Sequence, residues 1–302
     1  LGWYDLGEIE GRTLAYAYRE FVTANFTGKG YGVVDREIGR YLTPAPIIEF
    51  MVKLANPKPQ DRIIDFACGS GGFLAGVLGY LGEKIDREKF LKDNLFACDV
   101  DLFSVSTAKT FLNLLLPGRQ ENLNIFHHNG LWSERIHSWE KEDIRSLISS
   151  GSFDLVISNP PGGADYNLNY EKHLKKKLPL VLEGRKLQNT PLFIQRAIQL
   201  VKSGGKICLV VPDGILANTQ LQYLRDYILE NCRLKAIISL PRVFPNAPSK
   251  MSILYMRKTR PDKDKKVFMA SVRTGIDPET KKEYNLETEL NEIYEKYKKF
   301  ER

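Results

Sequence analysis

The stretch IIDFACGSGGFL, residues 63–74, decides the fold of this chain. An apolar run that ends at Asp65 predicts a buried strand, and the glycine-rich turn after it opens a helix predicted at residues 72–81. Gly69 and Gly71 let the backbone turn tightly and approach a ligand with no Cβ in the way. A strand, a glycine turn and a helix in this order predict a ligand site at the carboxyl end of a parallel strand.

The sequence around this turn predicts an α/β fold. From about residue 41 to residue 258, short apolar runs alternate with helical patterns, as in a largely parallel sheet covered on both faces. The segment between the last two predicted strands is too short for a helical crossover, so we expect the last strand to run antiparallel to its neighbour. The predicted strands cover residues 62–67, 94–98, 124–127, 153–158, 206–211, 234–240 and 251–257. The predicted helices cover residues 47–55, 72–81, 102–115, 192–201 and 221–231.

The two ends of the chain differ from this central region. The N-terminal end holds a helical stretch at residues 16–26, and the C-terminal end is highly charged, lacks a core strand pattern and predicts a surface helix at residues 286–300. We therefore expect an N-terminal helical extension at residues 1–40, a central domain at residues 41–260 and a charged C-terminal extension at residues 261–302. Because the chain does not begin with Met, we expect the N-terminal extension to be truncated.

The composition is that of an ordinary globular protein, with 43% hydrophobic and 27% charged residues. The sequence contains no run of about 18 apolar residues, so it predicts no membrane span. The first residues show no signal-peptide pattern. The four cysteines are scattered without a CxxC pair, so we expect reduced thiols in a cytoplasmic protein and no metal site. A net charge of +7 is compatible with a polyanionic partner but is weak evidence for one.

Acidic residues at two predicted strand ends favour S-adenosylmethionine over a dinucleotide. An NAD(P) site needs the GxGxxG spacing and places a pyrophosphate at the helix N-terminus. Asp65 would repel a pyrophosphate but attract the cationic aminoacyl end of S-adenosylmethionine, and Asp99 is placed to accept hydrogen bonds from ribose hydroxyls. We expect Asp101 to cap the next helix rather than bind a ligand. A strand–turn–helix corner without a ligand is the alternative.

A second segment, FDLVISNPPGG at residues 153–163, predicts a buried strand that ends in Asn159 and a diproline. Pro160 keeps Asn159 out of the helical conformation, and the prolines fix the direction of the chain. An exocyclic amine such as N6 of adenine is a poor nucleophile, because its lone pair is delocalised into the ring. The Asn159 oxygen and the Pro160 carbonyl are placed to accept its two N–H bonds and so to raise the electron density on nitrogen. The alternative is a turn that closes a core strand.

Thr43 and Pro44 precede the apolar helix predicted at residues 47–55. Thr43 as the N-cap, with Pro44 in the first turn, is a sufficient structural account of these residues. From the residues alone, this segment predicts a helix start and no function.

Together, these segments resemble the gamma-class amino methyltransferases, and in particular the DNA-adenine modification subunit of type I restriction–modification systems. The similarity covers residues 39–258. Tyr-x-Thr-Pro matches the first cofactor motif of the family, DFACGSGGF its glycine loop, Asp99 its ribose acid and the NPP of residues 159–161 its catalytic tetrapeptide. Further on, residues 204–214 resemble the central strand with its loop, and residues 240–244 the segment near a flipped base.

The resemblance implies a fold, a reaction and a set of site residues. The fold is a seven-stranded, mostly parallel Rossmann-like methyltransferase sheet with an antiparallel last strand, helices on both faces and short helical extensions. The reaction is methyl transfer from S-adenosylmethionine to the N6 amino group of a flipped adenine by an adenine-specific DNA methyltransferase. The implied catalytic residues are Asn159, Pro160 and Pro161, and the implied cofactor-binding residues are Tyr41, Thr43, Pro44, Asp65, Ala67, Gly69, Ser70, Gly71, Gly72, Asp99 and Asn129.

Three positions depart from the family pattern. The tetrapeptide normally ends in Phe or Tyr, which stacks on the extruded adenine, whereas this chain has Gly162. Phe244 or Tyr166 would then contact the target base. Asn129 replaces an acidic residue and still accepts a hydrogen bond from the cofactor adenine, and Ala45 replaces a basic residue.

The resemblance also implies partners: double-stranded DNA, a specificity subunit, a restriction subunit and a second modification subunit. A separate specificity subunit reads the DNA in that family, which fits the lack of a recognition helix or zinc finger pattern in this sequence. The lysine-rich residues 172–177 suit a solvated turn as well as a phosphate contact. Two other functions stay open, an amino methyltransferase for RNA or a protein glutamine amide, and a catalytically silent subunit that binds cofactor or DNA.

Overall fold

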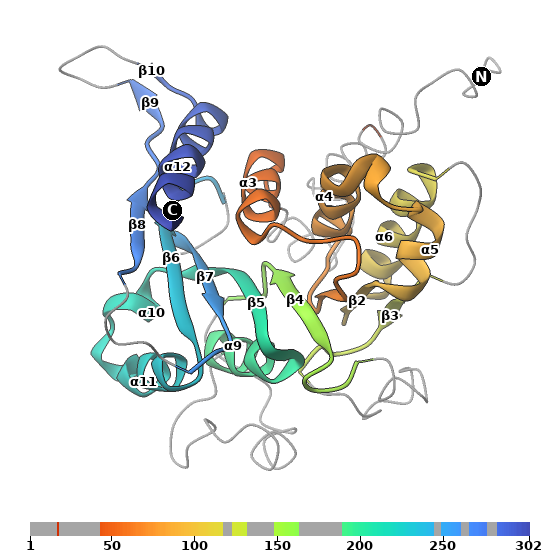
Figure 1. Cartoon of the computed structure of the whole chain (residues 1–302), viewed down its shortest axis with the longest axis horizontal. Coiled ribbons are helices and arrows are strands. Elements are labelled where there is room, and N and C mark those ends of the chain that lie inside the picture. Colours follow the sequence, from red (N-terminus) through yellow and green to blue (C-terminus); the bar gives the residue numbers. More distant parts are fainter. Residues whose placement is uncertain are drawn as a thin grey trace, which may run out of the picture.

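The computed structural model describes residue 17 and residues 43–116, 123–131, 148–162, 189–244, 249–260, 266–276 and 283–302. These residues form one eight-stranded sheet with helices on both faces, and its strand order is β3-β2-β1-β4-β5-β7-β6-β8 (Figure 1). The strands are β1 (Ile63–Asp65), β2 (Leu95–Asp99), β3 (Ile125–His127), β4 (Phe153–Ser158), β5 (Val201–Pro212), β6 (Arg233–Ser239), β7 (Met251–Arg257) and β8 (Phe268–Ser271). A separate two-stranded sheet pairs β9 (Gly275–Ile276) with β10 (Glu283–Tyr284).

The directions of the strands identify the edge of the sheet at which a ligand site is expected. β1 lies between β2 and β4 and is parallel to both, with Ile63 opposite Leu95 and Leu155. β3 and β5 extend this parallel block, and β7 is antiparallel to both β5 and β6. The carboxyl ends of β1, β2, β3, β4 and β5 therefore meet at one edge, where open α/β sheets bind ligands.

Two hydrophobic cores lie on opposite faces of the sheet, because successive strand residues point to opposite sides. Leu155 packs in one core and its neighbour Val156 in the other. The first core is covered by α3 (Ala45–Ala55), α4 (Gly72–Leu81), α5 (Arg87–Asp93), α6 (Leu102–Leu114) and α12 (Leu286–Glu301). The second is covered by α9 (Asn189–Leu200), α10 (Gly214–Ala217) and α11 (Gln222–Asn231). Short 3₁₀ turns, η2 (Gly82–Lys84) and η4 (Thr219–Leu221), follow α4 and precede α11. Of the described helices, none is long and apolar enough to cross a membrane.

The predicted α/β fold, its mostly parallel sheet and its antiparallel strand are confirmed. The predicted strand count is wrong, because β8 adds an eighth strand where no core strand was expected. Phe268 and Ala270 pack against the first core, whereas Met269 is 70% exposed, so this edge strand buries one face and carries no continuous apolar run. The domain boundaries at residues 40 and 260 stay predictions, and the helical stretch at residues 16–26 lies almost wholly outside the described residues.

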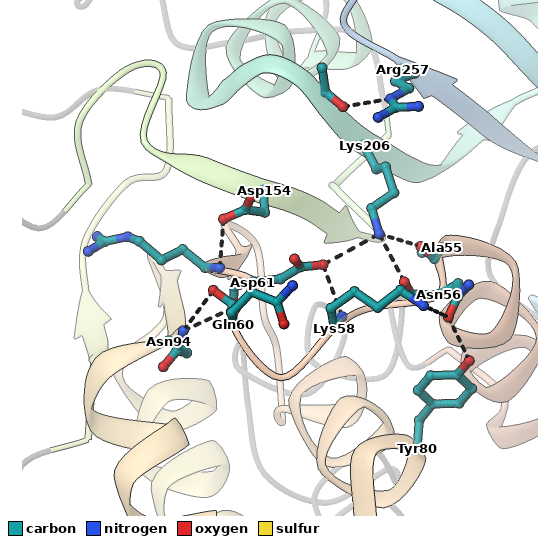
Figure 2. Close-up of polar contacts among 12 residues, drawn as sticks. Ala55, Asn56, Lys58, Gln60, Asp61, Tyr80, Asn94, Asp154, Lys206 and Arg257 are labelled. Atoms are coloured by element: carbon teal, nitrogen blue, oxygen red, sulfur yellow. Dashed lines mark hydrogen bonds and ion pairs between the residues drawn. The ribbon is translucent and has the colours of Figure 1, made fainter. Parts of the chain in front are cut away.

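A polar cluster at the opposite edge of the sheet holds the C-terminal end of α3 (Figure 2). Lys206 of β5 donates from Nζ to the carbonyl oxygens of Ala55 and Asn56, at 2.9 Å each, and lies 3.4 Å from Asp61 Oδ2. Asn56 ends the helix in the left-handed conformation, with φ of 46°. Burial lowers the pKa of Lys206, and Asp61 opposes that shift. A cation on the last carbonyls satisfies them and offsets the helix dipole, so α3 is fixed to the central strand.

Candidate functional site

Asp65, at the carboxyl end of β1, is the most unusual side chain of the site. It is 1% exposed, and its Oδ1 accepts hydrogen bonds from Ser158 Oγ at 2.6 Å and from the Ala67 N–H at 3.3 Å. Its Oδ2 is buried and has no hydrogen-bond partner among the described residues. Burial raises the pKa of Asp65 to about 7; the two hydrogen bonds lower it and Asp99 adds to the rise. A buried acceptor without a partner is costly, so this oxygen suits a ligand that brings a cation or a donor.

The glycine turn lies directly beside this carboxylate. Gly69 and Gly71 have positive φ of 49° and 83°, which L-residues rarely adopt. The Gly69 N–H donates to Asp99 Oδ2 at 2.9 Å, which ties the turn to the end of β2. A Cβ at Gly71 would lie 3.1 Å from Ala108 Cβ of α6. The turn is therefore tight and its backbone is held in place; Ala67 and Ser70 lie within it and Gly72 opens α4, and their role toward a cofactor stays a prediction.

Asp99 lies at the end of the neighbouring strand β2. Besides the Gly69 N–H, it accepts the Asp101 N–H on Oδ1 at 2.9 Å, and burial raises its pKa. A carboxylate oxygen has the capacity to accept more than one hydrogen bond, so both oxygens of Asp99 can also accept from hydroxyl groups of a ligand. Asp101 caps α6 through the N–H groups of Phe103 and Ser104, which confirms its predicted capping role.

Asn159 follows β4 and is 7% exposed. Its Nδ2 donates to Thr43 Oγ1 at 3.1 Å, a contact between residues 116 positions apart in the sequence. The prediction that Thr43 caps α3 is wrong, because Pro44 occupies the N-cap position and makes no side-chain cap hydrogen bond. The Thr43 hydroxyl instead fixes the Asn159 amide by its nitrogen, which directs the amide oxygen away from Thr43.

Asn129 lies in the loop after β3, and its Oδ1 accepts the Leu131 N–H at 3.1 Å. Its neighbour Gly130 packs so closely on the residue that follows β1 that a Cβ would lie 2.1 Å from the Phe66 carbonyl oxygen. The buried Arg196 of α9 donates to the Gly130 carbonyl at 3.1 Å, and burial lowers the pKa of this guanidinium to about 10. Sequence reasoning missed both Gly130 and Arg196. The available signal was the one charged residue, an arginine, within the mostly apolar predicted helix at residues 192–201.

The structure thus brings Thr43, Asp65, Asp99 and Asn159 to one edge, directly linked by hydrogen bonds or through the glycine turn. Asn129 follows the adjacent strand at the same edge, as β2 and β3 are paired. Phe244 is 6% exposed and packs in the first core, a position that does not favour base stacking in this conformation. Tyr41, Tyr166 and residues 172–177 lie outside the described residues.

Gly162, where an aromatic residue was expected, lies beside β5. A Cβ there would be 3.7 Å from Pro212 Cγ, an ordinary contact distance, and the glycine has no positive φ. There is therefore room at position 162 for the Cβ atom of a larger residue. As for metals, no group of three or more His, Cys, Asp or Glu residues suited to an ion occurs in the described part of the chain.

Comparison with known proteins shows similarity to DNA methylases. Residues 14–302 match the family model described as N-6 DNA Methylase. The chain is 28% identical over 234 residues to the "Type I restriction enzyme EcoEI methylase subunit" of Escherichia coli, an alignment that covers 75% of this chain and 44% of that protein. It is 26% identical over 239 residues to the MpnII methylase subunit of Mycoplasma pneumoniae, covering 76% and 42%.

Solved structures share the fold. The methyltransferase subunit of a type I restriction–modification system from Streptococcus thermophilus matches with a TM-score of 0.71 and 19% identity, over 99% of this chain and 60% of that one. A class I S-adenosylmethionine-dependent methyltransferase described as putative, from Listeria monocytogenes, matches with a TM-score of 0.68 and 21% identity, over 97% and 81%. The chain spans about half the length of the curated relatives it matches.

Proposed function

We propose that this chain, which belongs to the N-6 DNA methylase family, transfers a methyl group from S-adenosylmethionine to the N6 amino group of a flipped adenine in double-stranded DNA. The observation that carries the proposal is the Asn159 amide, fixed by Thr43 at the same sheet edge as the buried carboxylate Asp65. One group is suited to an amine and the other to a cation. Because β1 and β4 are paired and parallel, the ends that carry these two groups are adjacent, which suits a reaction between two ligands bound next to each other.

The residues present fit the cofactor, whose chemistry when bound is to supply an electrophilic methyl group. Asp65 Oδ2 would accept a hydrogen bond from the cofactor ammonium and so gain the partner that it lacks among the described residues. Asp99 would accept hydrogen bonds from the ribose hydroxyls, and the Asn129 side-chain oxygen would accept one from the amino group of the cofactor adenine. The turn from Ala67 to Gly72 would pack against the aminoacyl part through its backbone. Tyr41, Thr43 and Pro44 complete the proposed cofactor site.

Asn159, Pro160 and Pro161 would act on the target base. The Asn159 oxygen and the Pro160 carbonyl accept the two N–H bonds of the adenine amine, which draws the lone pair out of the ring and onto nitrogen. The nitrogen would then form its bond to the methyl carbon while the bond from that carbon to the cofactor sulfur breaks and leaves its electron pair on sulfur, and one amine proton would leave to solvent afterwards. The diproline holds both acceptors in place before the base arrives, so no rearrangement is needed at the moment of transfer.

The proposal extends to partners and location. Several relatives are named as methylase subunits of type I restriction enzymes. We therefore propose that the complete protein acts with a specificity subunit, a restriction subunit and a second modification subunit, in the cytoplasm where its DNA lies. Base stacking, which Gly162 cannot supply and the buried Phe244 does not favour, falls to Tyr166 or a partner in this proposal.

The test is methyl transfer by the full-length protein together with its specificity subunit. With labelled S-adenosylmethionine and duplex DNA, we expect the label in N6-methyladenine. Label in RNA or protein alone would contradict the choice of substrate, and tight cofactor binding without transfer would identify a silent subunit.

Replacement of the proposed catalytic amide tests the mechanism. Asn159→Ala removes one of the two acceptors for the amine, so we expect turnover to fall by at least about 100-fold, comparable to loss of one preorganised hydrogen-bonding group. Cofactor affinity, measured by calorimetry, should stay within about threefold of native. Unchanged turnover would remove Asn159 from the mechanism.

A further inference from the structure

Ser158 is a polar residue at the end of the buried strand β4, and nothing in the sequence motifs assigns it a role. It is fully buried, and its hydroxyl donates to Asp65 Oδ1 at 2.6 Å. It directly precedes Asn159 in the chain. Ser158 therefore contacts Asp65 of the proposed cofactor subsite and is the chain neighbour of Asn159 in the proposed target-base subsite.

We propose that Ser158 is a positioning residue that keeps Asp65 ionised and oriented for the cofactor ammonium and ties this carboxylate to the strand end that carries Asn159. The inference rests on the proposed function. A short hydroxyl–carboxylate hydrogen bond is of the charge-assisted kind, about twice as strong as a bond between neutral groups. It occupies Oδ1 and thereby leaves Oδ2 as the oxygen that meets the ligand.

The surroundings of Asp65 show why this hydroxyl matters. Burial raises the pKa of the carboxyl, and Asp99 from β2 acts in the same direction. The Cys68 thiol of the glycine turn faces the same group, and burial raises its pKa so that it stays neutral. Against these stand two donors, Ser158 Oγ and the Ala67 N–H, of which Ser158 has the larger effect on the Asp65 pKa. Loss of the hydroxyl would therefore favour the protonated carboxyl, which does not attract a cation.

The experiment measures binding of S-adenosylhomocysteine by calorimetry to the full-length protein from pH 6 to pH 8.5. Native protein should lose affinity as the pH falls below about 7, the pKa of Asp65. For Ser158→Ala we expect affinity about 10-fold weaker than native at pH 6.5, and within about threefold of native at pH 8.5, the change for a shift of one pKa unit. The ligand titrates identically with both proteins, so the ratio of affinities reports on the protein alone.

Two controls separate this role from a loss of packing. Ser158→Thr keeps the donor and should restore the native pH profile. 5′-Methylthioadenosine lacks the aminoacyl group, so its affinity should be the same for native protein and Ser158→Ala at every pH. If Ser158→Ala weakens both ligands equally, or by the same factor at every pH, the positioning role is wrong. If native protein binds S-adenosylhomocysteine but methylates no adenine, the proposed reaction fails while this inference about the cofactor site stands; no binding at all by native protein overturns both.

Discussion

At the scale of single residues, Asp65 shows a conflict between folding and ligand binding. Its folded-state pKa of about 7 lies above its ordinary value of 3.8, so folding disfavours the ionised carboxylate. Between these two values the folded protein binds more protons than the unfolded chain, and stability must fall as the pH rises through this window. Above about pH 7 the loss is complete and constant. In the proposed function, this cost is offset because the cofactor ammonium requires an ionised Asp65.

Asp65→Asn should therefore stabilise the cofactor-free protein at high pH. The amide keeps an oxygen for Ser158 and Ala67 but cannot ionise, so we expect unfolding to cost on the order of 2–4 kcal/mol more than native at pH 8 and on the order of 1–2 kcal/mol more at pH 5, where only part of the pH window has been crossed. Urea unfolding at the two pH values checks this. The same variant should bind S-adenosylhomocysteine at least about 10-fold more weakly at pH 8, where native Asp65 is charged. A variant less stable than native at pH 8 would show that the buried charge is not a cost.

At the scale of elements, the contact between α3 and α4 depends on one glycine. A Cβ at Gly76 would lie 2.6 Å from Ile48 Cγ2 and 3.4 Å from Val52 Cγ2, both on α3. Ile48 is buried and β-branched, so its side chain has little freedom to move aside. Since α3 carries Thr43 next to its N-terminus, the spacing of these two helices also sets where the Thr43 hydroxyl meets Asn159.

Two glycine substitutions in α4 separate packing from helix propensity. Gly79 is exposed, and a Cβ there would meet nothing within 4 Å, so Gly79→Ala should stabilise the protein by up to about 1 kcal/mol. Gly76→Ala gains the same propensity but forces the helices apart, so we expect a net destabilisation of about 1–3 kcal/mol. Chemical denaturation measures both. Equal stabilisation by the two variants would contradict the close contact.

The elements also show which parts of the fold could be predicted. The helix at residues 72–81 and the strands at residues 153–158 and 251–257 were predicted to the residue, because apolar patterns bounded by glycine, proline and polar residues define them locally. β8 and α5 were missed, because one is an edge strand with one buried face and the other a seven-residue helix dominated by charge. These elements depend on tertiary packing rather than on local pattern.

The site was predictable to a similar extent. Asp65, Asp99 and Asn159 lie at strand ends that a parallel sheet must bring to one edge, so their grouping follows from the sequence pattern. The bond from Asn159 to Thr43 does not, because it joins residues 116 positions apart, and the local pattern of Thr43 predicts a helix cap instead. The Asp65–Ser158 contact depends likewise on the register of β1 against β4. Long-range hydrogen bonds of this kind require the packed structure.

At the scale of the whole molecule, the C-terminal end belongs to the same core as the proposed catalytic edge. α12 lies beside α3 (Figure 1), and Lys53 of α3 donates to Asn291 of α12 at 3.3 Å. The Tyr297 ring meets the rings of Phe268 on β8 and Tyr255 on β7, with centroids 5.4 Å and 6.3 Å apart. α3 is thus held by α12 along its side, by Lys206 at its C-terminal end and by Asn159 next to its N-terminus.

Loss of this support should reach the site from a distance. Tyr297→Ala removes a buried aromatic ring between α12, β7 and β8, so we expect a loss of about 3–5 kcal/mol in unfolding free energy, the usual cost for a large core side chain. Glu295→Ala, on the exposed face of the same helix, should stay within about 0.5 kcal/mol of native. Because Tyr297 anchors α12 to β7 and β8, and α12 in turn contacts α3 through Asn291, Tyr297→Ala should also slow methyl transfer at temperatures where the protein is still folded, whereas Glu295→Ala should not. Denaturation and transfer assays on both variants decide the matter: if Tyr297→Ala has the stability of Glu295→Ala, the C-terminal helix is an appendage and the fold of the catalytic edge is complete without it.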